Sequence, residues 1–223
     1  MSKAKNKTMF SILFIPFMFL LIMWGVKIIE LQFDLSFVKL GVFPQRAVGL
    51  KGIFLSPFIH KDLSHLLNNS YPILILGGLL FSVYRKIAHK VFVWLFFISG
   101  FWLWIIGRPS FHIGASGIIY ALASFIFASG ILSKNPRLSA LSLVVIFLYG
   151  SMLWGILPTK QPISWEGHLS GFFAGIIVAL FFKDEVPKQK KYQWEIEEEI
   201  EEKLLKEQTI DINYIIKKES KKY

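Results

Sequence analysis

The chain has 223 residues and 54% of them are hydrophobic, including 22 Phe and 7 Trp, which is too apolar for one water-soluble domain and indicates a polytopic membrane protein. Its formal net charge of +10 gives no reason to expect nucleic acid, because the excess of Lys and Arg lies beside apolar stretches, where it would face anionic lipid headgroups. The absence of cysteine excludes disulfides, thiol catalysis and cysteine-ligated zinc.

Six apolar stretches are long enough, or nearly long enough, to cross a hydrocarbon core about 30 Å thick. The first follows three lysines as a signal peptide would, but it is long and no small-residue cleavage pattern follows it, so we predict a retained helix. These stretches form one all-α membrane domain over 9–182, between a cytoplasmic segment 1–8 and a charged tail 183–223. The six predicted transmembrane helices cover about 9–29, 64–83, 91–106, 116–132, 138–157 and 168–182.

Lysine and arginine predict how the bundle is oriented. Six spans place both termini on one side of the membrane. If that side is cytoplasmic, the inner segments up to Lys191 hold 12 basic residues and the outer segments hold 7, among them Lys27, although the first outer loop is long. Because cytoplasmic loops are the ones enriched in Lys and Arg, both termini are predicted to be cytoplasmic. The lysine-rich inner flanks suit a bacterial cytoplasmic membrane.

The predicted second helix begins with two polar side chains, His65 and Asn69. They are four residues apart and therefore neighbours on one helix face, so two hydrogen-bond donors point into the same cavity. The alternative is an interfacial first turn capped by Asp62 or Ser64. That alternative accounts for His65 but poorly for Asn69, which lies one turn deeper and needs a partner.

A serine and a histidine begin the predicted fourth and sixth helices. Ser116 lies in Gly114-Ala115-Ser116-Gly117, and His168 opens another glycine-rich segment. The predicted topology places both of them at the same shallow outer depth as His65 and Asn69. A serine that caps a helix is common in any bundle, whereas a histidine inside a span is rarer and usually faces a polar cavity. Their joint occurrence favours a shared site.

These residue types suit amide hydrolysis. A serine hydroxyl becomes a nucleophile when a base takes its proton, and an imidazole can take that proton and later give it to the leaving amine. The oxyanion of the tetrahedral intermediate needs donors, for which His65, Asn69 and the backbone N–H of Ser116 are candidates. The positive end of a helix dipole at Ser116 adds to that stabilisation.

Small residues allow the fourth and sixth helices to approach closely. Gly167, Gly171 and Gly175 recur every four residues on the sixth helix, opposite Gly117 and Ala121 on the fourth. Faces of this kind let helix backbones touch in a membrane. Many unrelated bundles have such a repeat, and it gains weight here because the histidine adjoins it.

Three motifs, in order along the chain, resemble the rhomboid family of intramembrane serine proteases. The resemblance covers roughly residues 10–182 and implies a rhomboid-like bundle of six helices. Its pieces are His60 and His65-xxx-Asn69 after Ser56-Pro57-Phe58, then Gly114-Ala115-Ser116-Gly117 with Tyr120, and Gly167-His168 with Gly171.

The resemblance also implies a role for each residue. Ser116 would be the nucleophile and His168 the general base, a dyad without the carboxylate of the usual triad. His65 and Asn69 would line the oxyanion hole, and Tyr120 would pack against the His168 ring. The implied substrates are transmembrane segments of other proteins, cut near the outer membrane surface without a cofactor. The supporting residues would be Gly114, Gly117, Gly167 and Gly171.

Two outer segments are compared with those of the rhomboid family. The first outer loop, about 32–61, lacks the Trp-Arg pair seen in many relatives, and its apolar residues, such as Phe33, are candidates to dip into the headgroup layer. The loop from 158 to 165 would help to cap the site if this chain resembles the family. Glu166 lies beside His168, but neighbours at a helix start point apart, so we do not predict a triad.

Three other functions compete with a protease. A channel or transporter would carry polar groups at several depths, yet the inner halves of the helices are nearly featureless. A metal site lacks both a His-Glu-x-x-His motif and an acidic residue inside a span, so His60 and His112 are interpreted as interfacial loop residues. A catalytically inactive relative that binds membrane-protein clients would normally have lost the nucleophile or the base, and this chain keeps both.

The tail changes character after Lys183. Ile196, Ile200 and Leu204 recur every four residues in an acidic segment, which predicts an amphipathic cytoplasmic helix. A solvated appendage is the favoured interpretation, over docking to the membrane surface or to a partner helix.

Overall fold

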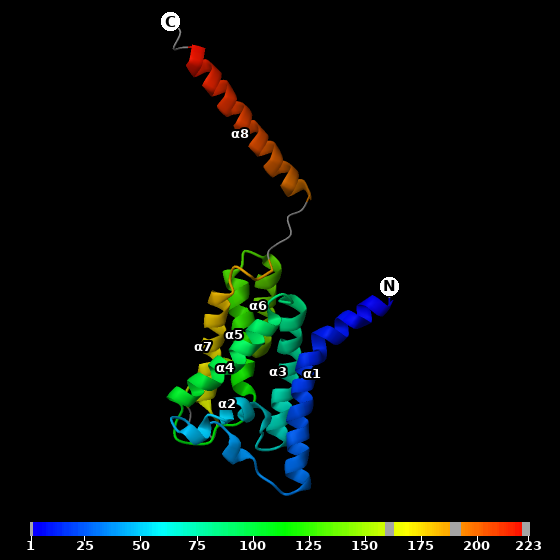
Figure 1. The fold of residues 1–223 in the computed structure, drawn as a ribbon, viewed down its shortest axis with the longest axis vertical. Coiled ribbons are helices and arrows are strands. Elements are labelled where there is room, and N and C mark those ends of the chain that lie inside the picture. Colours follow the sequence, from blue (N-terminus) through cyan, green and yellow to red (C-terminus); the bar gives the residue numbers. More distant parts are fainter. Residues whose placement is uncertain (1, 159–162, 188–192, 220–223) are drawn as a thin grey trace. The chain divides into compact units, whose positions relative to one another are not determined.

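The computed structural model describes residues 2–158, 163–187 and 193–219, which form helices and their connections (Figure 1). Those ranges contain no β-strand, only one antiparallel bridge between Val42 and His112. The α-helices are α1 (Ser2–Gln32), α2 (Gly52–Leu55), α3 (Leu63–Val83), α4 (Ala88–Ile106), α5 (Ser116–Leu132), α6 (Pro136–Tyr149), α7 (Trp165–Phe181) and α8 (Gln193–Glu219).

The all-helical architecture expected from the sequence is confirmed for the described residues, and each of the six predicted ranges carries a helix. The helices α5 and α7 are apolar and have 17 residues each. At 1.5 Å per residue each is about 25 Å long, slightly shorter than a typical hydrocarbon core. Within the described ranges, the helical segments that are long and apolar enough to cross a membrane are Ile12–Gln32, Leu63–Val83, Ala88–Ile106 and Pro136–Ile156.

Helix α5 is the most enclosed helix of the bundle and packs against α7, α6, α3 and α4 (Figure 1). Its Leu122 and Phe125 side chains are fully buried. A Cβ atom added to Gly171 would overlap the carbonyl oxygen of Gly117, so the backbones of α5 and α7 touch there. Close packing of this kind drives helix association in lipid, because helices that are already in the membrane gain nothing from removing apolar surface from water. The contact brings the first turns of α5 and α7 together.

Side-chain caps fix the starts of α3 and α7. The Asp62 carboxylate accepts a hydrogen bond from the His65 backbone N–H at 2.8 Å, and Ser164 Oγ accepts one from the Gly167 N–H at 3.3 Å. Each cap satisfies an N–H that has no partner within its own helix. Asp62 is thus the cap of α3, while Asn69 is buried one turn after His65.

The predicted fifth helix, 138–157, changes conformation before its end. Helix α6 stops at Tyr149, where φ is −120° and ψ is 1°, and a 3₁₀ segment, η4, covers Gly150–Ile156. Because 3₁₀ bonds join residues three apart, the chain in η4 is wound more tightly than an α-helix and its carbonyl groups point elsewhere. Two of those carbonyl groups reach the candidate site.

The segment between α1 and α3 is folded against one end of the bundle (Figure 1). Val42 and His112 exchange two backbone hydrogen bonds of 3.0 and 2.8 Å, and the Gln45 N–H donates to the Trp104 carbonyl at 2.9 Å. Trp104 Nε1 donates to the Arg46 carbonyl at 3.0 Å. Backbone hydrogen bonds and the Trp104 indole N–H therefore anchor this loop without a Trp-Arg pair. Its 3₁₀ turns are η1 (Val38–Leu40), η2 (Ala47–Gly49) and η3 (Ser56–Phe58).

Lys27 and Glu30 correct two points of the sequence analysis. We counted Lys27 with the outer segments, but it lies inside α1, which continues to Gln32, and it is 8% exposed. The expectation that no acidic residue lies inside a span was also wrong, because Glu30 belongs to the candidate span Ile12–Gln32. Their side chains form an ion pair of 3.1 Å. Pairing is what allows both charges to be buried.

The second compact unit, Gln189–Tyr223, contains helix α8. Ile196, Ile200 and Leu204 are exposed on it. Lys206 lies 3.7 Å from Glu202, one turn away. Exposed pairs of this kind add only a few tenths of a kcal/mol to helix stability.

Candidate active site

Ser116 and His168 meet between the first turns of α5 and α7. Ser116 is the first residue of α5, and the start of α7 places His168 beside it. His168 Nε2 lies 3.0 Å from Ser116 Oγ, which is hydrogen-bond distance, and only 9% of His168 is exposed. Two residues that are 52 positions apart in the sequence are therefore in direct contact.

The second ring nitrogen of His168 faces a backbone carbonyl. His168 Nδ1 lies 2.9 Å from the Gly155 carbonyl oxygen of η4. A carbonyl can only accept, so Nδ1 carries the proton and Nε2 is left as an acceptor for the Ser116 hydroxyl. This is the tautomer that a general base needs.

Tyr120 holds the plane of the His168 ring. The two rings are stacked, with centroids 4.2 Å apart and planes 12° apart. The Tyr120 hydroxyl donates to the Met152 carbonyl at 2.6 Å. Tyr120 comes from α5, one turn after Ser116, so one helix carries both Ser116 and the ring that stacks on His168.

Gly155 and Met152 were not identified from the sequence. Both act through carbonyl groups, which every residue has, so side-chain identity carried no signal for Met152. Gly155 did offer one, because a Cβ atom there would lie 3.1 Å from His168 Nδ1 and would overlap the Tyr120 hydroxyl. The space beside His168 and Tyr120 thus requires a glycine at 155.

His65 and Asn69 line the same cleft as the dyad. The cleft has a volume of about 960 Å³, and its walls include His65, Asn69, Ser116, Tyr120 and His168. The Asn69 side-chain amide donates to the His65 carbonyl at 2.8 Å and is buried. All the side chains selected from the sequence for the nucleophile, the base, the ring support and the oxyanion donors are therefore brought together.

Gly114 lets the chain before Ser116 pass close to His65. Its φ is +102°, a region that residues with side chains rarely adopt. A Cβ atom at this position would lie 2.7 Å from His65 Nε2 and 3.9 Å from the Asn69 side-chain nitrogen. The glycine is thus needed both for its conformation and for the approach of His65.

Glu166 and His112 take part in the packing around the dyad. Glu166 is buried and lies 3.6 Å from Arg108 Nε, while both ring nitrogens of His168 have other partners, so Glu166 is not a third member. His112 Nδ1 is 2.6 Å from Oγ of Ser164, the cap of α7. His60 and His112 both lie in connections between helices, as expected from the sequence, and they are buried there, with 1% and 3% exposed. Burial lowers the pKa of His112.

The expected capping loop is only partly described. Its residues 159–162 lie outside the described part of the chain. At its end, the Ile163 carbonyl accepts a hydrogen bond of 2.9 Å from Arg108, and Ser164 begins α7.

Acidification is expected to destabilise the protein through His60. Burial above all, then the neighbouring His65 and Lys27, lowers the pKa of His60 from 6.5 to about 4. The unfolded chain binds the proton more readily, so the stabilisation is present above pH 6.5 and is lost as the pH falls to about 4. The loss amounts to about 3 kcal/mol. Tm measured in detergent from neutral pH to about pH 4 tests this. A His60→Gln variant with an equally steep pH dependence would contradict it.

Comparison with known proteins identifies relatives over most of this region. A model of the Rhomboid domain matches residues 49–185, a range that contains all the cleft residues named above. An uncharacterized protein of Mycobacterium tuberculosis is 34% identical over 166 residues, which is 68% of each chain. An uncharacterized protein of Mycobacterium leprae is 30% identical over 172 residues, which is 72% of this chain and 67% of that protein.

Proposed function

We propose that this chain, which belongs to the rhomboid family, is an intramembrane serine endopeptidase that hydrolyses peptide bonds in or near transmembrane segments. The observation that carries the proposal is the contact of 3.0 Å between Ser116 Oγ and His168 Nε2, with Nδ1 held by the Gly155 carbonyl. A nucleophile, a base within hydrogen-bond reach and a group that orients the base are the parts that acyl transfer requires.

The reaction follows from the positions of two protons, one on His168 Nδ1 and one on the Ser116 hydroxyl. Ser116 Oγ attacks the carbonyl carbon of the scissile bond while its proton passes to His168 Nε2. The carbon–nitrogen bond then breaks as His168 gives that proton to the leaving amine. A water molecule attacks the resulting acyl-enzyme, His168 takes the proton of the water, and the proton returns to Ser116 as the carboxylic product leaves.

The imidazolium formed during each step is stabilised by neutral groups. The Gly155 carbonyl accepts from Nδ1 before and after the transfer, so the ring keeps its orientation. Tyr120 offers its ring face to the developing cation, an interaction that favours positive charge. No carboxylate is used in this scheme.

Donors for the oxyanion come from α3 and α5. An amide nitrogen has two N–H groups, so the bond from Asn69 to the His65 carbonyl leaves one for the oxyanion. His65 Nε2 and the Ser116 backbone N–H complete the set. Each such donor contributes roughly a hundredfold to a thousandfold in kcat.

The membrane topology that we propose has six spans, with both termini in the cytoplasm of a bacterial cell. The dyad then lies near the outer surface, because Ser116 and His168 occupy the first turns of helices that enter from outside. The substrates are transmembrane proteins whose helices open there and expose a peptide bond to the cleft. The four long apolar helices and the apolar α5 and α7 support this arrangement.

Cleavage of test substrates by the purified protein decides between a protease and a binding protein. The protein is placed in liposomes with a panel of labelled single-span proteins, and the products are identified by mass spectrometry. We expect discrete products cut at or near the span, together with labelling of Ser116 by a fluorophosphonate probe. Retention of the panel on immobilised protein without cleavage or labelling would support a catalytically inactive client-binding relative instead.

A further inference from the structure

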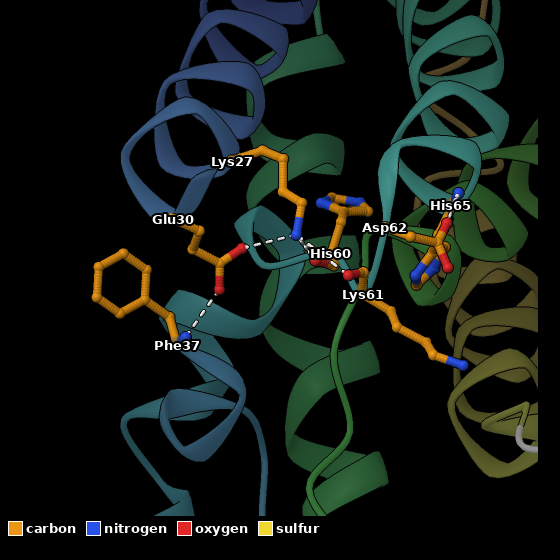
Figure 2. A network of polar contacts seen from close by, with 7 residues as sticks. All are labelled: Lys27, Glu30, Phe37, His60, Lys61, Asp62 and His65. Atoms are coloured by element: carbon orange, nitrogen blue, oxygen red, sulfur yellow. Dashed lines mark hydrogen bonds and ion pairs between the residues drawn. The ribbon is translucent and has the colours of Figure 1, made fainter. Parts of the chain in front are cut away.

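A buried ion pair on α1 holds the connection that leads into α3 (Figure 2). Lys27 Nζ donates to Glu30 Oε2 at 3.1 Å, to the His60 carbonyl at 3.0 Å and to the Lys61 carbonyl at 3.1 Å. An ammonium group has three N–H donors, so these contacts use all of them. The pair lies before the range matched by the Rhomboid domain, which begins at residue 49.

The second oxygen of Glu30 extends the same network to the outer loop. Glu30 Oε1 accepts a hydrogen bond from the Phe37 backbone N–H at 2.7 Å. One charged pair therefore joins the end of α1, the start of the loop and the entrance of α3, and every contact outside the pair goes to the backbone. Backbone groups bonded in this way fix the course of the chain whatever side chains it carries.

A contribution to folding stability does not by itself explain why a buried ion pair is present here. Taking two charges out of water is costly, and well-packed apolar residues in their place often give equal or greater stability. Lys27 and Glu30 are 8% and 5% exposed. The property that apolar residues would not reproduce is the fixed position of the His60 and Lys61 carbonyls.

The position of the His60 and Lys61 carbonyls determines where His65 lies, because few residues separate them and direct contacts join them. Lys61 directly precedes Asp62, the cap of α3, and Asp62 accepts the His65 backbone N–H at 2.8 Å, as Figure 2 shows. The His60 and His65 rings are also in edge-to-face contact, with centroids 5.0 Å apart. On its other side His65 faces Gly114, where there is no room even for a Cβ atom.

We propose that Lys27 and Glu30 are positioning residues that hold His65 in place to stabilise the oxyanion. This inference rests on the proposed protease function. The two residues touch neither the substrate nor the dyad and act through the backbone at residues 60–62. The charge of Glu30 offsets that of Lys27, so the pair contributes to stabilisation of the oxyanion through the position of His65 and not through its charge.

A double-mutant cycle with His65 tests the path. Lys27→Met is expected to lower kcat about tenfold to a hundredfold, with KM unchanged, because a small displacement of a donor is costly in the transition state. In a His65→Ala background the same substitution should have no further effect, since the residue through which it acts is gone. Steady-state cleavage of a single-span substrate gives both constants.

Two further variants separate positioning from folding. Lys27→Met combined with Glu30→Met removes both charges, so no unpaired charge is left in the interior, and it should show the same loss of kcat. Trp24→Phe removes a hydrogen bond from α1 to Ser70 on α3 and should leave kcat unchanged. Losses of kcat that add fully to that of His65→Ala, or that appear equally in Trp24→Phe, would overturn the inference.

Hydrogen exchange gives a readout that does not depend on activity. The His65 backbone amide is expected to exchange at least tenfold faster in Lys27→Met than in the unmodified protein, and Trp24→Phe should leave its rate unchanged. An unmodified protein that cleaves nothing would refute the proposed function, and the exchange rate would still decide whether the pair holds the start of α3. Unchanged exchange in Lys27→Met would refute the positioning role even if the protein is an active protease.

Discussion

Substitution of Ser116 by alanine is expected to lower kcat for cleavage of a transmembrane substrate by about a millionfold, as removal of an activated serine does in other hydrolases. The hydroxyl lies 3.0 Å from His168 Nε2, and alanine offers nothing for the base to activate. His168→Ala should cause a loss of similar size, because the serine then keeps its proton. Single-turnover cleavage in liposomes measures both variants against the unmodified protein.

The two losses should not add, and that is the sharper part of the expectation. In the proposed mechanism Ser116 and His168 act in one proton transfer, so the double variant should be no slower than either single variant. Ser82→Ala and His89→Gln are matched controls near the end of α3 and the start of α4, away from the dyad, and should retain full activity. Cleavage that survives Ser116→Ala would mean that the nucleophile is elsewhere.

Gly171→Ala is expected to damage both the fold and the activity. The new Cβ atom would overlap the carbonyl oxygen of Gly117, which is backbone and cannot turn aside, so α5 and α7 must separate. Overpacking of this kind costs about 1–3 kcal/mol. Because Ser116 and His168 begin those same helices, their contact would lengthen and kcat should fall about a hundredfold. Thermal unfolding in detergent and the cleavage assay measure the two effects.

Gly25→Ala provides the matched control for that substitution. A Cβ atom at Gly25 has no other heavy atom within 4 Å. Alanine favours a helix over glycine by about 1 kcal/mol, so Tm should stay the same or rise slightly. If Gly171→Ala also left Tm and kcat unchanged, the backbone contact between α5 and α7 would not be what sets the distance within the dyad.

The parts of this protein that could be predicted from the sequence are those in which side chains carry the information. Apolar length predicts the helices, and glycine spacing predicts which two pack closely. Three predicted helices start with polar residues, among them Ser116 and His168. An even number of spans separates those starts, so they lie on the same side of the membrane, and this indicated one site. Tyr120 was placed by family resemblance.

The parts that were missed depend on the backbone or on pairing at a distance. Nothing in the apolar run 138–157 indicates that it becomes a 3₁₀ turn at Gly150, because that change depends on local dihedral angles. Lys27 was counted as a loop cation since its partners at residues 60 and 61 are distant in sequence. Glu30, three residues after it, was the available signal: a Lys and a Glu at that spacing share a helix face.

The carbonyl of Gly155 has a consequence for how this site varies during evolution. A carboxylate that orients a histidine depends on one side chain, whereas a carbonyl belongs to the main chain. Only the requirement for glycine at 155 remains, because a Cβ atom there would overlap the Tyr120 hydroxyl. The rest of η4 is therefore free to drift in sequence while the base stays oriented. A search for a third catalytic side chain by mutagenesis would find none in this turn, although the group that orients the base is there.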